Sequence, residues 1–166
     1  PFVLVAGRDE AGLRAAAEAF AADRPAFEIP GLKLRAIGKF LALVPAAPCP
    51  PLEALAAATV ETLDPFRAPA PPEELEKRRR AGLSDRQEAM LRRWGYPYVM
   101  EEFRFHLTLT GALDSVEHAF AMSVLTPEAA GLAAEPVPVT ELVPFRQPDR
   151  TTPFRVNRRF TLRGGG

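Results

Sequence analysis

The residues best placed to do chemistry lie in one alternating segment, 103–111, which reads Phe-Arg-Phe-His-Leu-Thr-Leu-Thr-Gly. Side chains alternate between the two faces of an extended strand, so the pattern predicts a central strand over 103–110 with one buried apolar face and one polar face. The buried face would comprise Phe103, Phe105, Leu107 and Leu109. The polar face would carry side chains roughly 7 Å apart, and these are Arg104, His106, Thr108 and Thr110. An imidazole that titrates near neutral pH, beside hydroxyl and guanidinium donors, suits the binding and protonation of a phosphate ester. The alternation also fits a half-exposed strand in which the threonines serve β-propensity and the histidine has no chemical role.

The tripeptide His106-Leu107-Thr108 matches the His-x-Thr motif of the two-histidine phosphoesterase superfamily, which includes cyclic phosphodiesterases and RNA-ligase-like enzymes. Four longer segments resemble one branch of that superfamily: 94–99 (WGYPYV), 103–111 (FRFHLTLTG), 63–69 (LDPFRAP) and 40–45 (FLALVP). The resemblance covers nearly the whole chain, from Pro1 to about Arg163. Members of this branch are commonly encoded beside bacterial phosphonate-utilisation genes.

The resemblance implies a bilobed α+β fold, in which two pseudo-repeats of strand-helix-strand-strand surround a central cleft and a helical insertion joins them. It implies chemistry on a phosphodiester without a metal or another cofactor, and it makes His106 and Thr108 the catalytic residues. In such chemistry one histidine takes a proton from water or a hydroxyl, a second protonates the leaving oxygen, and the threonines steady the phosphoryl oxygens. The implied partner is a small-molecule phosphodiester or a phosphonate-pathway substrate, with the end of an RNA as the one nucleic-acid exception.

Four further residues are candidates for binding the substrate: Arg104, Thr110, Tyr98 and Arg67. Arg104 would hold the phosphate or pair with a carboxylate, and Arg67 could reach the cleft. Tyr98 would line the cleft as an aromatic wall, or would pack with Tyr96 in a fixed loop. Lys33 and Arg35 alternate with leucines on another expected strand, so the sequence leaves open whether they face the cleft.

The second histidine of the chain, His118, does not complete the expected pair. A helix is expected around it, and the inward stripe of that helix would comprise Val116, Ala119, Phe120, Ser123 and Val124. His118 lies about 200° around the helix from Val116. We therefore predict that His118 is a solvated surface residue.

An internal repeat predicts where the other motif belongs. Both halves read as strand, helix, strand and strand, at 2–6, 9–22, 32–37 and 40–44, and again at 103–110, 115–125, 137–145 and 154–163. In the second half the motif begins about ten residues before its helix, so its counterpart in the first half falls before Pro1. The sequence therefore predicts a chain that starts just after the first motif and has weak or no activity by itself.

The repeat divides the chain into an incomplete first lobe (1–48), a helical insertion (49–96) and a second lobe (97–166). The insertion should contain a helix over about 50–63, and another that Ser84 and Gln87 begin with a capping box and Gly95 ends. Between them, the run Arg78-Arg79-Arg80 could bind phosphate. Glutamates at i,i+4 spacing fit a solvated, internally paired helix instead.

Composition narrows the class of protein. The chain has 166 residues, 47% of them hydrophobic, which is enough to bury a core. Its 21 basic residues equal its 21 acidic ones, which removes the electrostatic case for a nucleic-acid or membrane-surface protein. No transmembrane run or signal peptide is evident, and the single Cys49 can form no internal disulfide, so a cytoplasmic location is predicted. No metal is expected, because no cluster of Cys, His and Asp has metal-ligand spacing.

Two classes of function stay open on the sequence alone. The first is a phosphodiesterase, whose mechanism requires a second histidine. The second is a non-catalytic module that binds a phosphorylated small molecule or a nucleotide end. The oligomeric state is not predicted.

Overall fold

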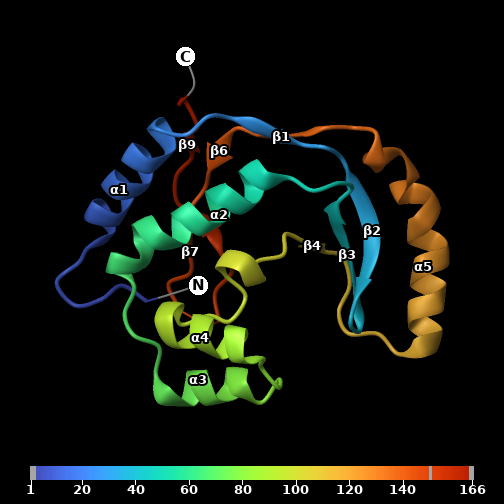
Figure 1. The fold of residues 1–166 in the computed structure, drawn as a ribbon, viewed down its shortest axis with the longest axis horizontal. Coiled ribbons are helices and arrows are strands. Elements are labelled where there is room, and N and C mark those ends of the chain that lie inside the picture. The colour runs from blue at the N-terminus through green and yellow to red at the C-terminus, as the bar shows by residue number, and fades with distance from the viewer. Residues whose placement is uncertain (1–2, 150, 165–166) are drawn as a thin grey trace. The chain divides into compact units, whose positions relative to one another are not determined.

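The computed structural model describes residues 3–149 and 151–164, which form five α-helices and several small antiparallel sheets, an α+β arrangement (Figure 1). The chain divides into two compact units. The first unit comprises the residues up to 26, residues 54–103 and the residues from 140 onward, and the second unit comprises residues 27–53 and 104–139. The three-part division expected from the repeat stays a prediction.

The second unit is built on a three-stranded antiparallel sheet of order β2-β3-β4. Its strands are β2 (Leu32–Ile37), β3 (Phe40–Pro45) and β4 (Leu107–Thr108), and helix α5 (Ser115–Ala129) packs against β2 and β3 (Figure 1). A separate pair joins β1 (Phe27–Ile29) to β5 (Val137–Val139). The core consists of Ile29, Leu32, Cys49 and Leu52, with partly buried apolar side chains around them that include Leu43, Phe105 and Leu132.

The motif strand is shorter and more exposed than its alternation predicts. Only Leu107 and Thr108 pair with a neighbour, and β4 lies at the edge of the sheet, so the prediction of a central strand over 103–110 is wrong. Leu107 is 44% exposed and Leu109 43%, although both were expected to be buried. Beyond Thr108 the Leu109 amide still donates to the Leu41 carbonyl, but the Leu41 amide donates to the Thr110 side chain and not to a backbone carbonyl, so the ladder ends there.

Helix α5 turns a different face to the sheet from the one expected. Asp114 and Glu117 form the capping box that starts it. The expected inward stripe is exposed, with Val116 at 77% and Phe120 at 70%, and His118 is half-buried rather than solvated. The helix has apolar residues around most of its circumference, so its sequence does not select which stripe packs.

The first unit contains α1 (Glu10–Ala22), which Asp9 caps and which packs against β9 (Phe160–Thr161) and β6 (Glu141–Leu142). The two long strands expected over 137–145 and 154–163 are broken into short pieces, among them β7 (Phe145–Arg146) and β8 (Arg155–Val156). Pro144 has no amide to donate to a ladder, which fits the break between β6 and β7, whereas segment 154–163 contains no proline and its break has no explanation in the sequence. The strand expected over 2–6 is reduced to a bridge between Leu4 and Arg67, and Phe2 lies outside the described residues.

The helical insertion follows the sequence closely. Helix α2 (Pro50–Leu63) begins in the second unit and continues into the first, where α3 (Pro72–Arg79) and α4 (Asp85–Trp94) follow. The capping box of Ser84 and Gln87 is confirmed, and Gly95 ends α4 in the left-handed conformation with φ of 69°. Across residues 3–149 and 151–164, no helix has both the length and the apolar character needed to cross a membrane.

Candidate active site

The strand register assembles a polar face on the sheet of the second unit. Thr108 lies opposite Ala42 on β3, and Ala42 lies opposite Arg35 on β2. Residues paired across an antiparallel ladder point to the same face, so Arg35 and Thr108 share a face with Ala42 between them. Alternation along β2 and β3 places Lys33 and Phe40 on that face as well, and the contact of the His106 ring with Phe40 brings His106 to it. The apolar partners Leu43 and Leu107 lie on the opposite face, as the alternating pattern predicts.

His106 is held in one orientation by two contacts. Its Nδ1 lies 2.8 Å from the carbonyl oxygen of Arg104, and its ring centroid lies 5.8 Å from that of Phe40, tilted by 43°. A carbonyl oxygen only accepts hydrogen bonds, so Nδ1 carries the proton and donates it. The exposed imidazole therefore keeps Nε2 for a ligand, as an acceptor when neutral and as a donor when charged.

The two threonines of the motif strand differ. The hydroxyl of Thr110 accepts a hydrogen bond from the Leu41 amide (3.0 Å) and donates one to the Gly111 carbonyl (2.9 Å). Within the described part of the chain, the Thr108 hydroxyl makes no hydrogen bond, and the Thr108 side chain is exposed. Thr108 can thus donate to a phosphoryl oxygen, whereas Thr110 anchors β4 to β3.

The remaining candidates divide between the units. Arg104 is exposed in the second unit, and its backbone carbonyl positions His106. Tyr98 belongs to the first unit, where its ring meets Tyr96 edge-on at 5.7 Å. Arg67 also belongs to the first unit. Substrate binding by Arg104, Thr110, Tyr98 and Arg67 stays a prediction.

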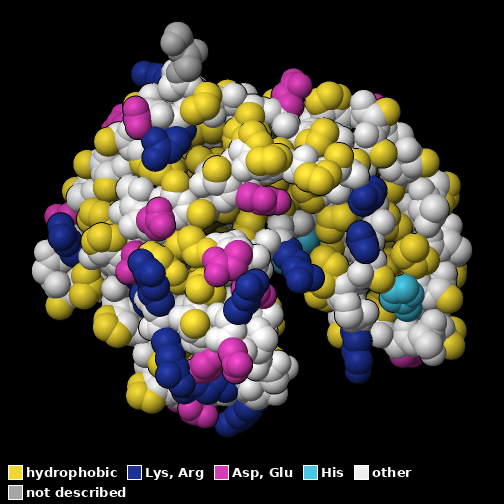
Figure 2. All heavy atoms as spheres, in the orientation of Figure 1, with side chains coloured by type: hydrophobic (Ala, Val, Ile, Leu, Met, Phe, Trp, Pro, Cys, Tyr) yellow, Lys and Arg dark blue, Asp and Glu magenta, His cyan; other side chains and the backbone are white. Residues whose placement is uncertain are grey.

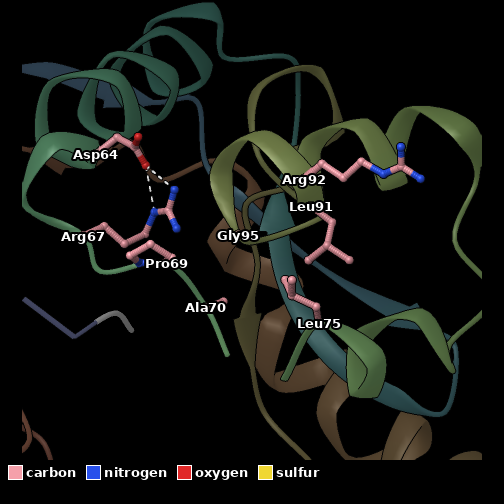
Figure 3. Close-up of a pocket in the computed structure, with 8 residues that line it drawn as sticks. All are labelled: Asp64, Arg67, Pro69, Ala70, Leu75, Leu91, Arg92 and Gly95. Carbon is pink, nitrogen blue, oxygen red and sulfur yellow. Dashed lines mark hydrogen bonds and ion pairs between the residues drawn. The ribbon is translucent and has the colours of Figure 1, made fainter. Parts of the chain in front are cut away.

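Arg67 lines a hollow of about 380 Å³ within the first unit (Figure 3). Its guanidinium pairs with the Asp64 carboxylate at 2.7 Å and donates to the Arg93 carbonyl at 3.4 Å. Gly95 has a positive φ that favours glycine, and a Cβ there would lie 2.7 Å from Nη1 of Arg67, so a side chain at this position would displace the end of the Arg67 guanidinium. The contacts of Arg67 therefore tie the end of α4 to the turn that follows α2.

Charge is segregated within the second unit. Its four cations are Lys33, Arg35, Lys39 and Arg104, and no acidic residue occurs in segments 32–45 and 104–113. Figure 2 shows basic side chains in dark blue over the β2–β3 hairpin. Among residues 3–149 and 151–164, every ion pair lies in the first unit, so none neutralises these four cations.

Sequence reasoning missed the contributions of Phe40 and Arg35 to this face. The signal for Arg35 was present as alternation of cations and leucines on β2, but only the register of β2, β3 and β4 shows which face those cations share. Nothing in the sequence near Phe40 indicates its contact with His106. In the described ranges, no group of three or more His, Cys, Asp and Glu side chains is gathered where it could hold a metal ion.

These features define an α+β protein with one sheet face that combines a histidine, a threonine and unneutralised cations. The chain belongs to the family described as "Protein of unknown function (DUF1045)", which it matches over residues 1–155.

Two curated relatives are similar to the chain, both carrying the name "Ribose 1,5-bisphosphate phosphokinase PhnN". One, from Janthinobacterium sp. (strain Marseille), is 39% identical over 173 residues, which span 100% of this chain and 38% of the relative. The other, from Laribacter hongkongensis (strain HLHK9), is 35% identical over 160 residues, or 95% of this chain and 36% of the relative. The chain thus spans less than two fifths of the length of these relatives. No solved structure matches it.

Proposed function

We propose that this chain is a phosphoesterase-type domain, and that the face carrying His106 and Thr108 binds the phosphoryl group of a phosphodiester. The observation that carries the proposal is the state of His106. Its Nδ1–H donates to the Arg104 carbonyl, so Nε2 is available to a ligand, near the exposed Thr108 and on segments (32–45 and 104–113) that contain no acidic residue. A fixed imidazole of this kind serves as a general acid or base.

The proposed fold is the bilobed one of the two-histidine phosphoesterases, with the His-x-Thr motif at residues 106–108 contributing one half of the catalytic machinery. His106 exchanges a proton with water or with the leaving oxygen, and Thr108 donates a hydrogen bond to a phosphoryl oxygen. One general acid or base of this kind typically accelerates a reaction about 100- to 10,000-fold. A site that used His106 alone would therefore turn over slowly, and the mechanism needs no metal or other cofactor.

The names of the relatives support a phosphorylated sugar as the kind of molecule bound. They are named for a kinase of ribose 1,5-bisphosphate, and the chain matches only part of each. The 166 residues contain no Gly-x-x-x-x-Gly-Lys-Ser/Thr segment, the loop with which many kinases hold ATP. We therefore assign to this chain a role on a phosphodiester in phosphonate metabolism, in the cytoplasm, and not the kinase step.

The second candidate is a module that binds a phosphorylated small molecule or a nucleotide end without turnover. It is favoured by the fact that only one histidine is on this face, since the other, His118, is on α5. The two candidates differ in turnover and not in binding.

The test assays the protein on a panel of cyclic and linear phosphodiesters, with and without a chelator. We expect turnover that the chelator does not change, and a loss of about 100-fold or more in His106→Gln. His118→Gln is the matched control, because it removes the other histidine of the chain, and it should leave turnover unchanged. Binding without turnover in the unsubstituted protein would select the binding module. Equal losses in both variants, or neither binding nor turnover, would refute a site at His106.

A further inference from the structure

The polar face carries more positive charge than a phosphodiester requires. A phosphodiester group bears one negative charge. The segments that form this face with His106, 32–45 and 104–113, contribute three cations, Lys33, Arg35 and Arg104, and contain no acidic residue. Within the described ranges, none of the three cations has an ion-pair partner. Unneutralised cations on one face favour a ligand with more than one anionic group.

Arg35 is separated from Thr108 by one strand. The pairing of Arg35 with Ala42, and of Ala42 with Thr108, sets the two Cα atoms about 10 Å apart, which is two interstrand spacings. Ala42 lies between them and is fully buried, so a ligand that contacts both residues would pass over the side chains that cover Ala42. At this separation Arg35 and Thr108 suit two different groups of one molecule.

Lys33 extends the same positive edge along β2. Its ammonium donates a hydrogen bond to the Ala46 carbonyl at 2.8 Å. That bond fixes the side chain and uses one of its three donors, which leaves two for a ligand. Arg35 makes no hydrogen bond through its side chain among the described residues, so its whole donor fork is available.

We propose that Arg35, with Lys33 beside it, binds a second phosphoryl group of the same molecule. The ligand is then a phosphodiester that also carries a phosphate monoester, with the diester at His106 and Thr108 and the monoester at β2. This inference rests on the proposed function, since it takes the diester to lie at His106.

The test measures binding by calorimetry, on the full 166-residue chain, of adenosine 2′,3′-cyclic phosphate and of the same compound with a 5′-phosphate. We expect the 5′-phosphorylated compound to bind about tenfold more tightly or better, as a charge-assisted bidentate contact provides. Arg35→Gln should remove this preference by lowering the affinity for the 5′-phosphorylated compound at least tenfold more than that for the unphosphorylated compound, and Arg35→Lys should keep part of the preference. Lys39→Gln makes the same change in charge at the β2–β3 turn and should keep the preference.

The outcomes separate this inference from the proposed function. An equal loss for both compounds in Arg35→Gln, no preference in the unsubstituted chain, or no binding of either compound would overturn the second subsite. A preference that depends on Arg35, in a protein that turns over neither compound, would support the subsite and refute the phosphoesterase. Circular dichroism of each variant verifies that the fold is retained.

Discussion

Every ion pair among the described residues lies in the first unit, and the second unit has none. In the first unit, some of the arginines on α3 and α4 pair with carboxylates, such as Arg79 with both Glu76 and Glu88, whereas Arg86 has no such partner among the described residues. In the second unit, Lys33, Arg35, Lys39 and Arg104 have no carboxylate partner within the described residues. The chain as a whole is neutral, so net charge alone conceals this difference.

Pairing with a carboxylate identifies cations that serve the fold. The arginine run 78–80 attracts attention in the sequence, yet Arg78 pairs with Glu74 and Arg79 with two glutamates. These contacts fit a solvated, internally paired helix, the alternative to phosphate binding that the spacing allowed. Arg35 belongs to no such run of basic residues, yet its guanidinium makes no hydrogen bond among the described residues and is available to a ligand.

The largest effect on stability is expected at Gly95 in the first unit. Gly95→Ala forces a side chain into the left-handed conformation and against Arg67, so the free energy of unfolding should fall by about 2–3 kcal/mol. Gly82→Ala is the matched control, because Gly82 has φ of 74° but nothing within 4 Å of its Cβ position. Denaturant unfolding of both variants measures the difference. Equal losses would show that displacing the Arg67 guanidinium costs no stability.

A smaller loss of stability is expected at Thr110 in the second unit. Thr110→Val keeps the shape but removes the acceptor for the Leu41 amide, and should cost about 1–2 kcal/mol because that amide is left unpaired. Thr108→Val makes the same change at a hydroxyl without an intramolecular partner and should leave the free energy of unfolding unchanged. A similar loss in both variants would contradict the anchoring role of Thr110.

Thr108→Val tests the ligand side of the same strand. It should weaken the binding of a cyclic phosphodiester severalfold, since one hydrogen bond among several is removed, while Thr108→Ser should retain the affinity. Calorimetry of the two variants with adenosine 2′,3′-cyclic phosphate provides the measurement. Unchanged affinity in Thr108→Val would show that the Thr108 hydroxyl does not contact the ligand.

Local features of the fold were predictable because they depend on neighbouring residues. The helices at 50–63 and after Ser84, and the β2–β3 hairpin, lie where their caps, prolines and alternation place them. The alternation in segment 103–111 also predicted that Leu107 and Thr108 lie on opposite faces of β4, and their pairs with Leu43 and Ala42 agree with this.

What the sequence could not predict depends on distant partners. Which residues of α5 are buried depends on which side of the helix packs against β2 and β3. Because apolar residues occur on several sides of α5, its sequence alone does not identify that side. The short length of β4 follows from its edge position and from the bond of Thr110 to Leu41, 69 residues away along the chain. The place of Arg35 in the site likewise depends on the register of three strands, so alternation along β2 alone left its direction open.

The smallest effect is expected from the ion pairs of α3 and α4, and it depends on pH. Hydrogen bonds from Arg79, and then from Arg92, lower the pKa of Glu88 from its usual 4.5 to about 2. A carboxylate with a depressed pKa in the folded state adds stability that is full above its unfolded pKa and disappears as the pH falls through its folded pKa. Glu88→Gln should therefore lower Tm slightly at pH 7, and the difference from the unsubstituted protein should close as the pH falls from about 4.5 to about 2. Arg35→Gln, on the unpaired face of the second unit, should show no such pH-dependent difference in Tm. Thermal unfolding of the three proteins across this range measures both effects, and a Tm difference for Glu88→Gln that persists at pH 2 would show that Glu88 stabilises the fold by something other than its charge.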